Sequence, residues 1–165
     1  MKKHFLGAML LCLPVLAIAQ SESGYGKTTW GMTPSQVVAA QGERARLIKP
    51  EKYKGSWGKV SINPVNIGAS DYKVVFLFDD NDHLIQTNVS SLEQKNAGII
   101  EDQFQNLRKL LTQKYGQPQF DGETVTWKTA VTTIELSKMV ITGIVAQVSI
   151  RYLPNQRVQG DTQDL

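Results

Sequence analysis

The chain is poor in the residues that build compact chemical sites, with one cysteine, Cys12, and two histidines in 165 residues. A single cysteine cannot close an internal disulfide, and the sequence has no Cys/His cluster that could hold a structural zinc. After the first twenty residues, no apolar run approaches the ~20 residues of a membrane-spanning helix. The net charge is only +3, which gives no broad basic surface for nucleic acid. A disulfide scaffold, a zinc module, a multi-span membrane protein and a nucleic-acid binder are therefore excluded.

The N-terminus holds the one long apolar segment, and it predicts a secretory signal peptide over residues 1–19. Two lysines precede the apolar run, and small residues at its end fit cleavage between Ala19 and Gln20. A membrane anchor would need a longer run without Pro14, and a lipoprotein would need a small residue in place of Leu11 before its cysteine. We therefore expect a periplasmic or secreted protein. Its mature chain would have 146 residues, no cysteine and a net charge of +1.

Residues 30–42 predict a short helix with well-marked ends. Thr33 is a suitable N-cap, and Pro34 is favoured at the first helical position. Gln36 completes a capping box with Thr33, because each side chain can accept from the backbone N–H of the other. Gly42 can adopt the positive φ that commonly ends a helix. The capping signals therefore place this helix without reference to the rest of the chain.

A longer helix is predicted to begin near Asn96 and to end at Gly116, with Pro118 just beyond it. Four apolar side chains recur between those ends at the helical period and form one stripe that a sheet could cover. The stripe consists of Ile100, Phe104, Leu107 and Leu111.

Strand patterns follow each helix. After the first helix, Val60 and Ile62 alternate with polar residues until Pro64. Residues 72–78 and 83–91 then flank a turn cluster and predict a β-hairpin. Three more strands are predicted after the second helix, at residues 124–128, 132–137 and 144–153.

This order of elements favours an α+β fold. We expect two helix-then-antiparallel-strands units, with the helices packed on one face of an antiparallel sheet, because successive strands are joined by short turns. The expected domain organisation is a single α+β domain over residues 20–153, followed by a loose polar tail over residues 154–165.

Two patterns in these elements resemble bacterial envelope proteins. The Gly-Met-Thr at 31–33, with Val37 and the closing Gly42, is similar to the helix opening of the small BamE/SmpA-type envelope proteins. The same start preceded by a tryptophan, the aromatic-x-aromatic strand at 76–78 and the Tyr-Gly-x-Pro helix end at 115–118 resemble uncharacterised exported bacterial α+β proteins. The resemblance implies a helix-on-sheet envelope domain that contacts other proteins, and it implies no catalytic residue. The chain lacks the lipobox cysteine of the BamE/SmpA-type proteins.

Few residues could carry catalysis. His83 is the only histidine of the mature chain, and it follows Asp79, Asp80 and Asp82, so a cation site or a general base is one interpretation. We favour a hairpin turn, because Asp and Asn side chains accept hydrogen bonds from turn backbone. The sequence has no Gly-x-Ser-x-Gly elbow, phosphate-binding loop or dinucleotide glycine pattern. We therefore expect no enzyme, no metal site and no cofactor.

Positive charge gathers in residues 43–59, here called the basic connector, which carries six basic residues against two acidic ones and two aromatic residues among them. Arginine, tyrosine and tryptophan are favoured at interfaces, so the basic connector is a candidate surface for an acidic partner. The commoner alternative is a solvated loop whose aromatic side chains fold back onto the core. The candidate binding residues are Arg44, Arg46, Lys49, Lys52, Tyr53, Lys54 and Trp57.

These observations predict an exported, non-catalytic binding or interaction protein of the bacterial envelope. Its partner would be another envelope protein or an anionic envelope component, with no nucleic acid and no transmembrane span in the mature chain. Two alternatives stay open. One is an inhibitor or immunity-type protein that blocks an envelope hydrolase or toxin, and the other is a small-ligand binder with a pocket between sheet and helices.

Overall fold

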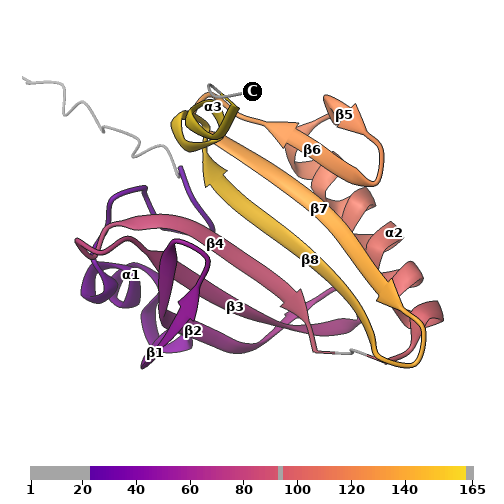
Figure 1. Cartoon of the computed structure of the whole chain (residues 1–165), viewed down its shortest axis with the longest axis horizontal. Coiled ribbons are helices and arrows are strands. Elements are labelled where there is room, and N and C mark those ends of the chain that lie inside the picture. Colours follow the sequence, from indigo (N-terminus) through magenta and orange to yellow (C-terminus); the bar gives the residue numbers. More distant parts are fainter. Residues whose placement is uncertain (1–22, 93–94, 163–165) are drawn as a thin grey trace, which may run out of the picture.

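The computed structural model describes residues 23–92 and 95–162, and the expected signal peptide lies outside these ranges. The described chain forms one antiparallel sheet of eight strands with three α-helices and a short 3-10 helix (Figure 1). The strands lie across the sheet in the order β1-β2-β3-β4-β8-β7-β6-β5. The α+β class predicted from the sequence is confirmed.

The two halves of the chain supply the two halves of this sheet. The first half contains α1 (Pro34–Gln41), η1 (Gly42–Arg44), β1 (Arg46–Tyr53), β2 (Ser56–Ile67), β3 (Ser70–Phe78) and β4 (Leu84–Ser91). The second half contains α2 (Ala97–Tyr115), β5 (Phe120–Asp121), β6 (Thr124–Lys128), β7 (Thr132–Ile141), β8 (Val145–Pro154) and α3 (Asn155–Thr162). The expectation of two helix-then-strands units is wrong, because β4 pairs with β8 and merges all eight strands into one sheet.

The helix ends are built as the capping signals predict. The Thr33 hydroxyl accepts from the backbone N–H of Gln36, and the Gln36 side chain accepts from the backbone N–H of Thr33 at 2.9 Å. Gly42 follows α1 with a φ of 67°. The Asn96 side chain caps α2 by accepting from the second and third backbone N–H groups of the helix, and Gly116 ends α2 with a φ of 86°. Local chemistry alone therefore fixes where both helices begin and end.

One face of the sheet carries the hydrophobic core, and both α1 and α2 pack on it. The predicted stripe of α2 is buried, with Ile100 and Leu107 at 0% and 2% exposure. Val37 of α1 belongs to the same cluster of buried side chains. Trp127 of β6 is 1% exposed, and its indole N–H donates to the carbonyl oxygen of Gly116 at 3.1 Å. The core thus extends from β2 to β6 across the sheet, and the Trp127 bond links the end of α2 to it.

The basic connector is not a loop. Most of it forms β1 and the first part of β2, which pair as a hairpin with Lys54 and Gly55 in the turn. Pro64 does not end β2, which continues to Ile67. The register of the β2–β3 pair shifts between Ile62 and Val65, so the proline lies where the hydrogen-bonded ladder is already interrupted.

The polar segment after β8 is helical rather than loose over residues 155–162, which form α3. Asn155 holds its first turn in place. Its backbone N–H donates to the carbonyl oxygen of Val131 at 3.0 Å, and its side-chain amide donates to that of Thr129 at 3.1 Å. The Thr133 hydroxyl donates to the Asn155 side chain at 2.8 Å. These bonds attach the start of α3 to the β6–β7 connection and to β7.

Neighbouring isoleucines on α2 test the role of this core. Ile100→Ala should lower the free energy of unfolding by about 2 to 5 kcal/mol, because a fully buried side chain is replaced by a cavity. Ile99→Ala is the matched control, since Ile99 is 42% exposed and should change stability by less than about 0.5 kcal/mol. Urea unfolding measures both. Equal losses from the two variants would contradict the burial of the α2 stripe.

Candidate functional site

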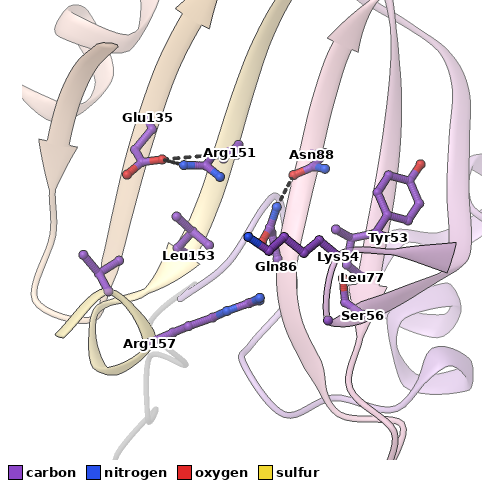
Figure 2. A pocket seen from close by; sticks show the side chains of 12 residues that line it. Tyr53, Lys54, Ser56, Leu77, Gln86, Asn88, Glu135, Arg151, Leu153 and Arg157 are labelled. Carbon is purple, nitrogen blue, oxygen red and sulfur yellow. Dashed lines mark hydrogen bonds and ion pairs between the residues drawn. The ribbon is translucent and has the colours of Figure 1, made fainter. Parts of the chain in front are cut away.

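The sheet face that α1 and α2 do not cover, here called the open face, contains a cavity of about 770 Å³ (Figure 2). One wall is the turn of the β1–β2 hairpin, and the opposite wall is the first part of α3. Residues of β3, β4, β7 and β8 form the floor between the two walls. Two of the candidate binding residues, Tyr53 and Lys54, belong to the hairpin wall.

Strand register decides which side chains the floor presents. Leu77 on β3 lies opposite Gln86 on β4. Asn88 on β4 lies opposite Arg151 on β8, which in turn lies opposite Glu135 on β7. Cross-strand partners share a face of the sheet, so all five side chains belong to the open face. With Leu153, which also lines the cavity from β8, the floor therefore combines two apolar side chains with two amides and an ion pair.

These polar groups are bonded to one another within the floor. The Gln86 side-chain amide donates to the side-chain oxygen Oδ1 of Asn88 at 2.7 Å. The Arg151 guanidinium donates through Nε to the Glu135 carboxylate at 3.0 Å and forms an ion pair with it. The described residues of the cavity lining include three cations, Lys54, Arg151 and Arg157, and one carboxylate, that of Glu135, which together carry a net charge of +2.

The Tyr53 ring forms the hairpin wall by lying against Gly58. A Cβ atom added at Gly58 would be 2.9 Å from Tyr53 Cε2 and 2.9 Å from Val75 Cγ1, so the ring occupies the space that a side chain would fill. The Tyr53 hydroxyl donates to the Glu51 carboxylate at 3.4 Å. Burial raises the pKa of the Tyr53 hydroxyl, and the charge of Glu51 raises it further. Tyr53 therefore stays protonated as a neutral, fixed wall.

Arg157 projects from the α3 wall, which Asn155 anchors to the β6–β7 connection. The Arg157 guanidinium donates to the carbonyl oxygen of Ile85 at 3.3 Å. This bond reaches across from α3 to β4, the strand that carries Gln86 and Asn88. The side chain is half-buried, and its position is thereby set by the sheet as well as by its own helix.

The remaining candidate binding residues lie outside the cavity lining. Lys52 and Trp57 are cross-strand partners on the covered face, where the Lys52 ammonium lies 4.0 Å from the centroid of the Trp57 ring. The Trp57 indole N–H donates to Asp80 at 3.0 Å. The other three candidates are exposed and lie near or on the edge strand β1; they are Arg44, Arg46 and Lys49. The Arg44 guanidinium, in η1, donates to the side-chain oxygen of Gln41.

The structure adds polar residues that the sequence analysis did not single out, among them Gln86, Asn88 and Arg157. The alternation of apolar and polar residues along β8 places Arg151 on the face away from the core, and this alternation was the one sequence signal for a residue of the cavity floor. Nothing local to Arg157 indicates that α3 folds back over the sheet, because its neighbours have no apolar period.

The Asp-rich segment before His83 is a turn, as the favoured interpretation predicts. The Asp79 carboxylate accepts from the backbone N–H groups of Asn81 and His83 at 2.9 and 2.8 Å. Partial burial works against its ionisation, but these hydrogen bonds outweigh it and hold the pKa of the Asp79 carboxyl below its usual value. The His83 ring lies 3.4 Å from the same carboxylate and is exposed. Both residues therefore shape the β3–β4 hairpin.

Within residues 23–92 and 95–162, no three His, Cys, Asp or Glu side chains are grouped so that they could hold a metal ion. In the same ranges, no helix is long and apolar enough to cross a membrane. No known family model, curated protein or solved structure matches the chain. Functional assignment therefore depends on the residues of the open face.

A double-mutant cycle tests whether Tyr53 lies against Gly58. Gly58→Ala should lower the free energy of unfolding by about 1 kcal/mol or more, because the new methyl group displaces the ring. The loss should be smaller in a Tyr53→Ala background, with a coupling energy of at least about 0.5 kcal/mol. Urea unfolding of the four proteins measures the coupling. Additive losses would show that the ring lies elsewhere.

Proposed function

We propose that this chain is an exported, non-catalytic binding protein of the bacterial envelope that holds its partner on the open face of its sheet. The charged and apolar pattern of residues 1–19 supports export. The local likeness to BamE/SmpA-type proteins supports an envelope role that depends on contacts with other proteins. The cavity of about 770 Å³ on the open face is the observation that carries the proposal.

The construction of the cavity favours binding. Its walls come from the β1–β2 hairpin and α3, and each wall is fixed by contacts of its own, through Gly58 and Asn155. Fixed walls reduce the conformational entropy that a partner must overcome on binding. The floor offers amide and charged groups with apolar residues beside them, a mixture that suits recognition of a polar surface.

The cavity also favours one of the alternatives, a small-ligand binder. Its volume falls within the ~300–1,000 Å³ typical of small-molecule sites. The position differs from the one expected, however, since the cavity lies on the open face and not between the sheet and its helices. The two functions use the same lining residues and differ in what occupies them.

Blocking the cavity by size tests the binding function. Asn88 lies in the floor and is half-buried, and tryptophan is well tolerated in strands. Asn88→Trp should therefore fold and fill the cavity. Affinity capture from an envelope extract, read by mass spectrometry, should then lose the wild-type partner by roughly tenfold or more.

Lys109→Trp is the matched control for this capture, because Lys109 is exposed on α2 at the covered side of the sheet. It should retain the same proteins as the wild type. Circular dichroism of both variants checks that the fold is intact. Retention of the same partner by folded Asn88→Trp would overturn the open face as the binding surface.

A thermal-shift screen with envelope metabolites separates the small-ligand alternative from a macromolecular partner. A small ligand that binds only the folded chain raises its melting temperature by mass action. The expected result for a small-ligand binder is stabilisation of the wild type that is lost in Asn88→Trp. A shift of equal size in both proteins would place the ligand outside the cavity.

A further inference from the structure

Two cations converge in the cavity from opposite walls. Figure 2 shows the Lys54 and Arg157 side chains pointing into the cavity, the first from the β1–β2 turn and the second from α3. The third cation, Arg151, is already paired with Glu135, the only carboxylate among the described lining residues. Within that described lining, Lys54 and Arg157 are therefore the two cations without a carboxylate partner.

Among the side chains described in residues 23–92 and 95–158, no carboxylate lies within ion-pair distance of the Arg157 guanidinium. The guanidinium donates to the carbonyl oxygen of Ile85, which carries no net charge. A half-buried guanidinium has lost part of its hydration, and an anion that binds to it replaces the lost water contacts. The other N–H groups of its planar fork stay available for a carboxylate.

Lys54 complements Arg157 from the other side. It is exposed in the hairpin turn, and no carboxylate in the described ranges lies within ion-pair distance of its ammonium. An exposed lysine alone would indicate little. Its direction toward a half-buried arginine gives the pair a shared point at which one anionic group can meet both.

The open face offers room for a ligand that is longer than a single anionic group. A second hollow of about 170 Å³ shares Tyr53 and Asn88 with the cavity, so the two lie end to end along the open face. The side-chain amides of Gln86 and Asn88 lie in the floor of the cavity, and Asn88 also lines the second hollow. Side-chain amides can donate to and accept from a peptide backbone, and the fixed Tyr53 ring offers an apolar contact beside them.

We infer that the partner presents an acidic segment of extended polypeptide to the open face, with one Asp or Glu carboxylate between Lys54 and Arg157. This inference rests on the proposed binding function and specifies its chemistry. The bound carboxylate accepts from both cations, and the segment continues over the two amides toward the second hollow. The ion pair of Arg151 with Glu135 stays intact and borders the segment.

Fluorescence anisotropy with labelled hexapeptides tests the inference. The probes are hexaglutamate, hexaglutamine and hexalysine, each titrated with the full-length mature chain. Hexaglutamate should bind, with affinity that falls as salt rises, because the charges are partly exposed. Hexaglutamine and hexalysine should bind roughly tenfold more weakly or not at all, since a charge-assisted hydrogen bond is lost.

Charge removal at the two cations provides the decisive comparison. Lys54→Gln with Arg157→Gln should weaken hexaglutamate binding by roughly tenfold or more. The control removes the same charge from two exposed lysines of α2 outside the cavity, through Lys109→Gln with Lys114→Gln, and should leave the affinity unchanged. Equal weakening in both double variants would show only an effect of net charge and would overturn the site.

The remaining outcomes separate this inference from the function on which it rests. If hexaglutamate does not bind while Asn88→Trp still abolishes capture, the acidic segment is wrong and the binding face stands. If free phosphate or citrate displaces hexaglutamate at concentrations similar to those of unlabelled hexaglutamate, the site takes small anions and the polypeptide is wrong. If Asn88→Trp leaves capture unchanged, the proposed function fails and the acidic segment fails with it.

Discussion

The pairing of β4 with β8 is the contact on which both faces of this protein depend. These strands come from opposite halves of the chain, and their antiparallel ladder is the only strand pairing between those halves in the described ranges. On the covered face it places Val89 beside Ile150, so the side chains packed under α1 and those packed under α2 form one continuous core. On the open face it places Asn88 beside Arg151 and brings the β1–β2 hairpin and α3 to two sides of one hollow.

The two faces differ because strand alternation sends different chemistry to each. Along β3, Phe76 and Phe78 are buried against the helices, while Leu77 points to the open face. Along β8, Ile150 and Tyr152 join the core, while Arg151 joins the cavity. A period of two thus separates the core side chains from those of the open face within the same strands. Substitutions on the open face can change the cavity lining with little effect on the core.

Local signals were sufficient for several elements. The capping box at Thr33, the stripe that begins at Ile100 and the Asp79 turn depend on residues within a few positions of one another, and each was predicted correctly. The strand β1 was missed because its residues are mostly exposed and include Pro50, which hides the alternation. Proline and lysine are tolerated there because β1 is an edge strand of the sheet.

The candidate site was predicted only in part, for a different physical reason. Composition identified Tyr53 and Lys54, since basic and aromatic residues gather near them. It could not separate them from Lys52 and Trp57, because the face of a strand residue depends on a pairing register that the basic connector did not reveal. Arg157 required the closure of β8 against β4, a contact between distant parts of the chain.

The distance along the chain between the two walls has a consequence for the order of folding. Lys54 lies in the first hairpin of the sheet and Arg157 in the last helix, roughly one hundred residues later. Closing so long a loop is entropically costly, and contacts of high sequence separation form late. The hollow is therefore completed only when the last strand has joined the sheet. The complete cavity is therefore a property of the whole native chain, because a chain that lacks the pairing of β8 with β4 does not bring its two walls together.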